Sequence, residues 1–368
     1  MKKIPPVDLA RQYSLISEET ENAVLKILNS GYYVGGAAVI DFEQDFAKYN
    51  QVEHCIACNS GTDALYLALR ALNIGAGDEV ITSTFTFIAT AEAVSMTGAK
   101  PVFIDIDCNT FNLDPTQIEK AITPRTKAII PVHLFGQPVN MSQVMEIAEA
   151  HRLYVIEDCA QATGAEWNSQ KVGSIGHIGC FSFFPTKNLG ACGDGGAMTT
   201  NDSAIANKVR MLREHGSSVR YRHDVMGINS RLDALQAAIL QVKLRYLDQW
   251  NQQRGEVAKR YQELCSPLPN LKLPQALAGG QHVWNQYTIM ISNRDQVREK
   301  LQEKGVIAMV YYPLPLHLQP VYQDLGYTVG QLPHSEQASH EVLSLPMFPD
   351  LTIEEQQQVV YCLKDCLS

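Results

Sequence analysis

The feature that most constrains the fold is an alternation, between about residues 52 and 200, of short β-rich runs with stretches of helical periodicity. Apolar residues recur at helical spacing in Leu65–Leu72 and Val144–Ala148, which indicates crossover helices. Such alternation is typical of a mostly parallel sheet covered by helices, so we expect an α/β fold. The expected strands are Glu79–Ser83, Pro101–Asp105, Ala128–His133, Leu153–Glu157, Cys180–Phe184 and Ala197–Thr200.

The length of 368 residues predicts two or three domains. Upstream of the alternation, Thr20–Leu28 has a helical pattern that stops at an Asn-Ser-Gly sequence. Downstream, Leu232–Trp250 is a long helical stretch, and we expect it to break near Gly255.

A segment that carries Pro and Gly, Pro267–Gly280, precedes the last part of the chain. That part contains a strand-like run at Gln286–Ile291 and a helix at Arg294–Gly305, an α+β pattern. We therefore expect a large domain over residues 1–250 and a smaller C-terminal domain over 251–368.

Charge and hydropathy exclude several classes of protein. Lys and Arg number 30 against 39 Asp and Glu, a net charge of -9 without a dense basic run, so nucleic acid is not an expected partner. No apolar run approaches the roughly 18 residues of a membrane helix. The first residues break into prolines and an aspartate instead of a signal peptide. We expect a cytoplasmic protein with no membrane partner.

Nine cysteines are scattered along the chain, and only Cys55 and Cys58 form a CxxC pair, beside His54. A zinc site would need a second pair at comparable spacing, and Cys362 with Cys366 is a poor candidate. Ordinary buried thiols are therefore favoured over metal or redox chemistry, and no metal is expected.

Open α/β sheets bind ligands beyond the carboxyl ends of their strands, and the first loop of interest there is Asn59–Asp63. It runs directly into the Leu65 helix and combines a glycine with hydroxyl side chains. A helix N-terminus presents unpaired N–H groups, so this loop can hold a phosphate. The alternative is an ordinary helix cap, which would be preferred if the loop stood alone.

Two further loops carry charged groups. Asp158 closes an apolar strand, where a carboxylate needs a partner or a cationic ligand, although a helix cap is also common there. Lys187 follows another apolar strand and precedes a glycine-rich segment, Gly193–Gly196. Desolvation can make such a lysine a Schiff-base nucleophile, although a surface lysine is an alternative. A phosphate cradle, a carboxylate and an amine together are the groups that pyridoxal 5'-phosphate (PLP) requires.

Four ordered motifs resemble those of the DegT/DnrJ/EryC1/StrS family of nucleotide-sugar aminotransferases, which are PLP enzymes of fold type I with an aspartate aminotransferase-like fold. The resemblance covers almost the whole chain. The motifs are Ser60–Leu65, Glu157–Gln161, Ser182–Lys187 and Gly227–Asp233.

The resemblance implies roles for individual residues around the cofactor ring. Lys187 would bind PLP covalently and later move a proton at the substrate carbon, and Asp158 would keep the pyridine nitrogen protonated. Gln161 would contact the side of the phenolic oxygen. Phe87 would stack on the ring, at a position where many relatives have Trp or Tyr.

For the cofactor phosphate, the resemblance points to Gly61, Thr62 and the Ser182 hydroxyl, with Asn229 reaching across from a second subunit. It therefore implies a homodimer with shared active sites. Asn229 lies between the segment Ser217–Asp224, which we expect to be a loop, and a long helix. The apolar residues of that helix suit a subunit interface, and the alternative for Asn229 is a helix cap. These apolar residues are Leu232, Leu235, Ala238, Ile239 and Val242.

The resemblance also implies the substrates, a nucleotide-linked keto-sugar and L-glutamate as amino donor, and a product for glycan (for example lipopolysaccharide) or antibiotic biosynthesis. Arg231, Tyr311, Tyr312 and His317 lie in segments that line the sugar and nucleotide pocket of relatives. Arg231 is equally compatible with an ion pair to Asp233 or another acid, and His317 with a surface position. The sequence Asn229–Asp233 around Arg231 resembles that of family members that aminate carbon 3. The resemblance therefore favours amination at carbon 3 of a dTDP- or UDP-linked sugar over carbon 4.

Three alternatives compete with transamination. A PLP-dependent sugar dehydratase of the same family would carry histidine in place of Lys187. A non-catalytic regulator would need a DNA-binding element, for which neither a basic patch nor a spare domain is present. A nicotinamide dehydrogenase would need the glycine fingerprint that this chain lacks.

Overall fold

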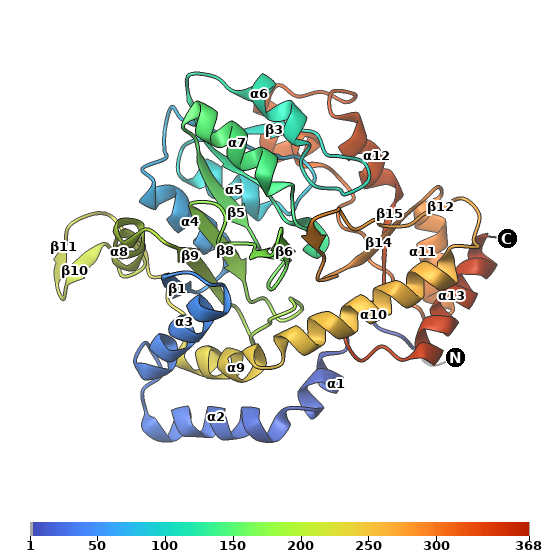
Figure 1. Ribbon diagram of the computed structural model, residues 1–368, viewed down its shortest axis with the longest axis horizontal. Helices are drawn as coiled ribbons and strands as arrows, with labels where there is room; N and C mark the ends of the chain where they lie inside the picture. The colour runs from blue at the N-terminus through green and yellow to red at the C-terminus, as the bar shows by residue number, and fades with distance from the viewer. Residues whose placement is uncertain (1–2, 368) are drawn as a thin grey trace.

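The computed structural model describes residues 3–367 and is built around one seven-stranded sheet (Figure 1). Its strands are β1 (His54–Cys58), β2 (Glu79–Ser83), β3 (Lys100–Ile104), β4 (Thr126–Ile130), β5 (Tyr154–Asp158), β8 (Ile178–Ser182) and β9 (Gly196–Thr200). They are ordered β1-β9-β8-β5-β4-β2-β3. The strands from β8 to β3 pair in parallel, whereas β9 pairs antiparallel with both β1 and β8. The predicted α/β class with a mostly parallel sheet is confirmed.

All six expected strands are present, with ends that differ from the prediction by at most three residues. The edge strand β1 was not predicted. Its sequence consists of His, Cys, Ile, Ala and Cys, with only one β-branched residue to indicate a strand. Cys55 and Cys58 are buried in this strand, and burial raises the pKa of both thiols, to about 12 for Cys58.

Helices cover both faces of the sheet (Figure 1). The helices are α1 (Leu9–Ser14), α2 (Ser17–Ser30), α3 (Ala37–Tyr49), α4 (Gly61–Ala71), α5 (Ala89–Met96), α6 (Ile118–Ala121), α7 (Met141–His151), α8 (Ser203–Leu212), α9 (Ala234–Leu244), α10 (Leu247–Cys265), α11 (Arg294–Glu303), α12 (Pro333–Glu341) and α13 (Ile353–Leu367). Short 3-10 turns are η1 (Pro115–Gln117), η2 (Leu134–Gly136), η3 (Leu316–Leu318) and η4 (Pro320–Leu325).

Side chains that alternate along the strands decide which helices lie on each face. From β1, Ile56 and Cys58 pack in a cluster with α4, α5 and α8. Cys55 and Ala57 point the other way and pack with α3 and α9. Further along this second face, α7 packs over strand residues such as Ile129. The sheet is thus apolar on both sides, as expected for buried parallel strands.

The C-terminal part forms a second core around a three-stranded antiparallel sheet, β12-β14-β15, against which α10, α11 and α13 pack. Ile4 joins this core through a bridge to Val306, so the start of the chain packs with its end. The division into 1–250 and 251–368 stays a prediction. The small strands outside the central sheet are β6 (Glu166–Trp167), β7 (Gln170–Lys171), β10 (Ser217–Val219), β11 (Arg222–His223), β12 (Leu271–Lys272), β13 (Gly280–Gln281), β14 (Tyr287–Ile291) and β15 (Val342–Leu345).

The predicted break of the long helix near Gly255 is wrong. The chain leaves helical hydrogen bonding at Arg245 and Tyr246, between α9 and α10, and Gly255 lies inside α10. A glycine costs a helix roughly 1 kcal/mol relative to alanine. Burial of neighbouring side chains on α10, such as Trp250 and Tyr261, outweighs that cost.

The segment Ser217–Asp224, which we expected to be a loop, contains the hairpin β10/β11, which projects from the body of the molecule (Figure 1). The apolar residues of α9 also differ from expectation. We expected them at a subunit interface, but Ile239 and Val242 are buried within the chain, where α2 and α3 pack on α9.

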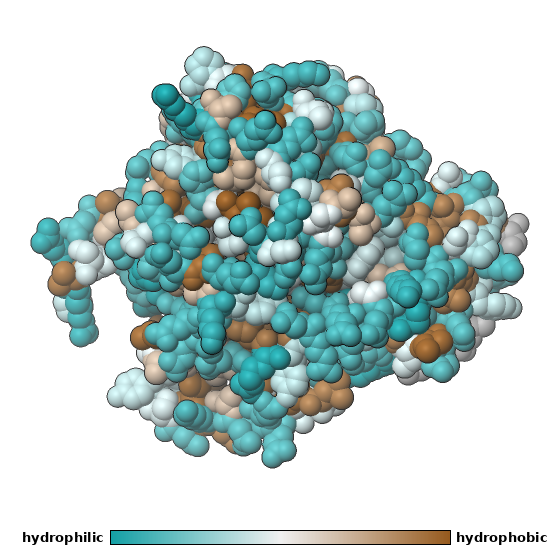
Figure 2. Space-filling model, viewed as in Figure 1, coloured by the Kyte–Doolittle hydropathy of each residue, from teal (hydrophilic) through white to brown (hydrophobic). Residues whose placement is uncertain are grey.

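Hydrophilic side chains cover most of the face seen in Figure 2, with apolar residues scattered among them. Within residues 3–367, no helix combines the length and apolar character needed to cross a bilayer.

Candidate active site

A cavity of about 440 Å³ lies at the carboxyl ends of β2, β5 and β8. It brings together most of the residues that the sequence singled out. Those that line it are Gly61, Thr62, Phe87, Asp158, Gln161, Ser182, Lys187, Tyr311 and Tyr312. Segments about 250 residues apart, those of Gly61 and Tyr312, therefore meet in one place, at the carboxyl ends of strands where ligands bind such sheets.

The N-terminus of α4 forms one wall of the cavity. Ser60 caps the helix by accepting a hydrogen bond from the Asp63 amide at 3.1 Å. No acceptor for the amides of Gly61 and Thr62 is found among residues 3–367, so both can bind an anion. A Cβ at position 61 would lie 2.7 Å from the Cβ of Ser182. Glycine is therefore what lets the Ser182 side chain approach this helix end.

Asp158 is the last residue of β5 and is buried. Its Oδ1 accepts from the Ala160 amide at 3.1 Å, and its Oδ2 accepts from the Thr90 hydroxyl at 2.8 Å. Burial raises the pKa of Asp158, while these hydrogen bonds and the nearby Lys187 lower it. A buried carboxylate in such a setting gains from a cationic ligand.

Lys187 follows β8, and its backbone amide donates to the Phe184 carbonyl at 2.9 Å. Burial lowers the pKa of its amine to about 8, and the charge of Asp158 opposes that shift. A sizeable fraction of the amine is therefore neutral near pH 8, the form that attacks a carbonyl group. The next residue, Asn188, is anchored by side-chain bonds to Asn251 and Asn285, which fixes the lysine loop.

Gln161 lines the cavity from the loop that follows β5. Its Oε1 accepts from the Phe135 amide at 2.7 Å, and its Nε2 donates to the Tyr312 hydroxyl at 3.0 Å. Phe87 is 55% exposed although it lines the cavity, so its ring has a face free for a planar ligand. The Phe87 and Tyr312 rings lie 6.0 Å apart.

Three predicted residues do not line the cavity, and their roles stay predictions. Asn229 forms an isolated backbone bridge to Glu214. Arg231 pairs with the same Glu214 at 3.4 Å, so the alternative of an ion pair with Asp233 or another acid is confirmed, with Glu214 as the acid. His317 is buried in η3, where its ring contacts the Thr84 hydroxyl at 2.8 Å and Glu336 at 3.2 Å. A surface position for His317 is therefore wrong.

Sequence reasoning missed several residues in the wall of the cavity, among them Thr86, Thr90, Asp194 and Gln286. Thr86 precedes Phe87 and lies before α5, whereas Thr90 lies in the first turn of that helix. No sequence signal indicated that their hydroxyl groups meet. Gln286 precedes β14, and nothing in its sequence surroundings pointed to the site.

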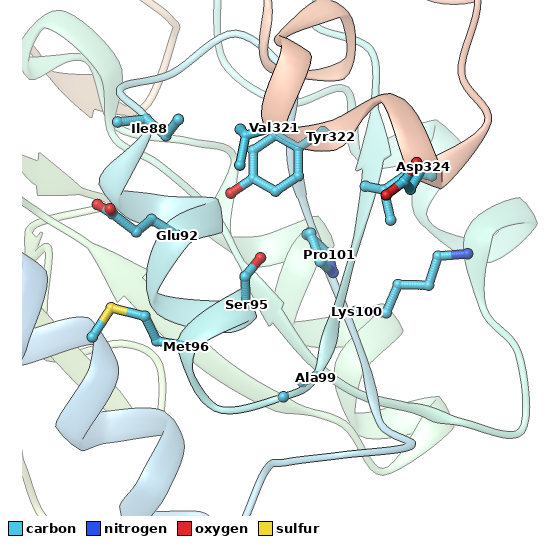
Figure 3. Close-up of a pocket in the computed structure, with 12 residues that line it drawn as sticks. Ile88, Glu92, Ser95, Met96, Ala99, Lys100, Pro101, Val321, Tyr322 and Asp324 are labelled. Carbon is cyan, nitrogen blue, oxygen red and sulfur yellow. The ribbon is translucent and has the colours of Figure 1, made fainter.

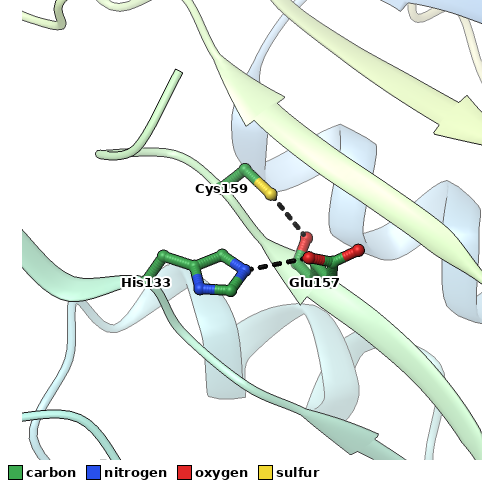
Figure 4. A group of neighbouring side chains, drawn as sticks. All are labelled: His133, Glu157 and Cys159. Carbon is green, nitrogen blue, oxygen red and sulfur yellow. Dashed lines mark hydrogen bonds and ion pairs between the residues drawn. The ribbon is translucent and has the colours of Figure 1, made fainter. Parts of the chain in front are cut away.

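Two other features lie apart from this chemistry. A shallower cavity of about 520 Å³ between α5 and η4 contains none of the predicted site residues (Figure 3). Buried His133, Glu157 and Cys159 form a cluster, in which Glu157 and Cys159 are the sequence neighbours of Asp158 (Figure 4). The Glu157 carboxylate already accepts from three backbone amides and from His133 Nε2, which fills its lone pairs. This cluster is therefore a structural anchor for the end of β5.

The donor set fits PLP. The α4 N-terminus and Ser182 would hold its phosphate, Asp158 its pyridine nitrogen and Lys187 its aldehyde carbon, with Phe87 against the ring. When bound, PLP supplies an electron sink for a carbanion formed at the substrate. The covered, mostly parallel sheet and this site define a PLP-dependent enzyme of fold type I.

Comparison with known proteins gives the particular family. The model of the DegT/DnrJ/EryC1/StrS aminotransferase family matches residues 14–364. The chain belongs to this family, whose members use PLP, and a solved relative carries the cofactor as PMP.

Individual relatives match over nearly their full length. A protein from Geobacillus stearothermophilus, named a pleiotropic regulatory protein, is 50% identical, with 97% of this chain and 96% of that protein covered. A UDP-N-acetyl-3-dehydro-alpha-D-glucosamine 3-aminotransferase from Acidithiobacillus ferrooxidans is 48% identical, with 99% and 98% covered. The crystal structure of S. venezuelae DesV with a ketimine intermediate is 41% identical, covers 100% of this chain and 99% of its own, and superposes with a TM-score of 0.98.

Proposed function

We propose that this aminotransferase places an amino group on carbon 3 of a dTDP- or UDP-linked keto-sugar, with L-glutamate as the donor. The observation that carries the proposal is that Lys187, with its lowered pKa, and Asp158 line one cavity beside a helix N-terminus free to bind phosphate. Relatives named for amination at carbon 3 act on UDP-linked and dTDP-linked sugars, which supports this substrate class.

The side chains divide the work of the reaction. Lys187 Nζ would hold the cofactor and would move a proton at the reacting carbon of donor or sugar. Asp158 would hold the proton on the pyridine nitrogen, which the cofactor needs in order to act as an electron sink. The lysine argues against the dehydratase alternative, and an intact catalytic pair argues against a purely regulatory role despite the name of one relative.

The charges in the cavity support a second subunit at the site. Lys187 carries the only Lys or Arg side chain among the described residues that line it. A nucleotide diphosphate and the carboxylates of glutamate need cations or amide donors. We therefore propose a homodimer in which the second copy, with Asn229, completes each site. The cytoplasm is the proposed location, and glycan or antibiotic biosynthesis the proposed context.

A substrate panel tests this function. The purified holoenzyme is incubated with glutamate and with dTDP- and UDP-linked 3-keto or 4-keto sugars, and products are identified by mass spectrometry and NMR. We expect an amino sugar aminated at carbon 3, and none from Lys187→Ala. Exclusive turnover of 4-keto sugars would overturn the carbon-3 assignment. Loss of water from the sugar without amino transfer would identify a dehydratase.

A further inference from the structure

We propose that Thr90 and Thr86 form a hydroxyl chain that positions the Asp158 carboxylate for the cofactor's ring nitrogen. Both would then be positioning residues for transamination, acting through Asp158. The inference rests on the proposed role of Asp158, and its test separates the two.

The hydroxyl chain runs without a gap from Thr86 to Asp158. Thr90 Oγ1 lies 2.8 Å from Asp158 Oδ2, and Thr86 Oγ1 lies 3.2 Å from Thr90 Oγ1. All three side chains are buried, each with less than 5% of its surface exposed. The second carboxylate oxygen, Oδ1, is held by the Ala160 amide. Asp158 is therefore fixed at both oxygens before any ligand is present.

The chemistry of the groups sets the direction of the chain. An ionised carboxylate only accepts hydrogen bonds, and a hydroxyl has one proton to give. Thr90 donates its hydroxyl proton to Asp158. In the contact between the two hydroxyls, Thr86 must therefore be the donor and Thr90 the acceptor. Two hydrogen bonds that point the same way polarise each other and favour the charged form of the carboxylate. A proton on Oδ2 would have to reverse or break the Thr90 bond, and a proton on Oδ1 would weaken the acceptor that the Ala160 amide meets.

The charged form needs this support because of its surroundings. Burial raises the pKa of Asp158, and the groups that oppose burial are Thr90, the Ala160 amide, Lys187 and His133. Once Lys187 is bound to the cofactor, its charge is no longer that of a free ammonium group. The hydrogen bonds from Thr90 and the Ala160 amide then carry more of the support for the charged carboxylate.

The hydroxyl chain also connects Phe87 and Asp158, the two residues that would contact the cofactor ring. Thr86 and Thr90 flank Phe87, and the Thr90 amide donates to the Phe87 carbonyl at 3.3 Å. Asp158 lies 68 residues further along the sequence than Thr90, at the end of β5. The Thr90 bond therefore fixes the segment with the stacking ring relative to the aspartate that meets the ring's edge.

The competing explanation is that Thr90 only packs in the first turn of α5. Thr90→Val keeps the shape and removes the hydroxyl, Thr90→Ala removes it without a packing demand, and Thr90→Ser restores it. Thr82→Val is the matched control, because Thr82 is equally buried on β2 and its hydroxyl donates to the Ile130 carbonyl at 2.8 Å, away from Asp158.

The experiment loads each holoenzyme with PLP labelled with ¹⁵N in the ring and records the nitrogen's chemical shift from pH 6 to 9, together with kcat and KM. We expect the wild type, Thr90→Ser and Thr82→Val to hold the nitrogen protonated throughout. Thr90→Val and Thr90→Ala should show a shift towards the unprotonated value and a fall in kcat of about tenfold, the size expected for a hydrogen bond to a charged group. KM should change little, and Thr86→Val should show a smaller effect in the same direction.

Asp158→Asn, measured in parallel, separates the inference from its premise. Loss of the protonated signal in Asp158→Asn, with a wild-type signal in both Thr90→Val and Thr90→Ala, would overturn the hydroxyl chain alone. A protonated signal in Asp158→Asn would overturn the role of Asp158 itself, and the chain with it. Neither result touches the identity of the sugar, which the substrate panel decides.

Discussion

Lys187 is the residue on which the proposed chemistry depends most, because one amine serves as both the attachment point of the cofactor and the proton carrier. Lys187→Ala should lower turnover by several orders of magnitude, about 10³-fold or more, and leave the fold intact. The measurement is amino-sugar formation, with circular dichroism as the check on folding. Lys127→Ala, which changes an exposed lysine on β4, is the control. Near-normal turnover in Lys187→Ala would contradict the assignment.

The pKa of Lys187 predicts how cofactor loading depends on pH. Burial lowers this pKa to about 8, and only the neutral amine attacks the aldehyde of PLP. The rate at which apoprotein gains visible absorbance on mixing with PLP should therefore rise with pH below about 8 and level off above it. A rate that keeps rising towards the usual pKa of a lysine, near 10.4, would show that the amine is not desolvated.

Asp158→Asn tests the other half of the pair. Asparagine keeps the shape but cannot stabilise a positive charge on the ring nitrogen, so the carbanion becomes harder to form. Turnover should fall steeply while cofactor content falls only modestly, as measured by absorbance of the dialysed protein. An unfolded variant whose remaining folded fraction has a normal spectrum would make Asp158 a structural residue.

Individual residues were predictable where a loop after a strand displayed its chemistry in one short motif, as for Lys187, Asp158 and Gly61. Thr90 was not, because its partner is a carboxylate on a strand 68 residues away and a lone threonine has many uses. His317 illustrates the opposite error. Its proline-rich neighbourhood resembled a surface loop, yet bonds to Thr84 and Glu336 compensate its burial.

At the scale of single elements, α10 offers a test of helix stability. Gly255 lies inside this helix, and an added Cβ would meet no heavy atom within 4 Å beyond the helix itself. Gly255→Ala should therefore raise the free energy of unfolding by about 0.5–1 kcal/mol. Thermal or urea unfolding of the apoprotein measures this.

Gly173→Ala is the contrasting variant. Gly173 has a φ of +85°, and its added Cβ would lie 2.4 Å from the Phe181 ring, so this variant should destabilise the protein. Equal effects of the two substitutions would show that local helix propensity does not decide the outcome at position 255.

Helices and strands were predictable where one pattern of apolar residues continued through the whole element, as in β2 and α4. The break between α9 and α10 was not, because glycine is only a weak helix breaker and tertiary packing overrides it. Strand β1 was overlooked for a related reason. Its identity depends on pairing with β9, which lies about 140 residues later, and local propensity does not record that partner.

At the scale of the whole molecule, mixing two inactive variants tests the shared site. In a heterodimer of Lys187→Ala with Asn229→Ala, one site would carry both lesions and the other would be whole, so activity should return in part. If Asn229 acts within its own subunit, every site carries one lesion and mixing restores nothing. Subunit exchange is verified separately by mass spectrometry of differently tagged chains.

Exposed apolar residues that fit the proposed dimer lie outside α9, where we expected the subunit interface. The apolar residues of α9 are covered within the chain, whereas Tyr32, Tyr33 and Val34 remain half or more exposed. Adjacent exposed apolar residues of this kind often mark protein–protein contacts. The order of the motifs predicted the fold of one chain, whereas the exposure of Tyr32, Tyr33 and Val34 was apparent only once the neighbours of each helix were known.

The pairing of β1 with β9 sets the order in which a growing chain can acquire its structure. Residues 54–58 leave the ribosome long before residues 196–200, so the outer strand must wait without its partner until most of the sheet has been synthesised. The pairing of Ile4 is delayed longer still, because its partner, Val306, is synthesised about 300 residues later. The segment that contains Ile4 thus docks only after Val306 has been synthesised, and nascent chains halted before residue 196 should expose β1 to protease.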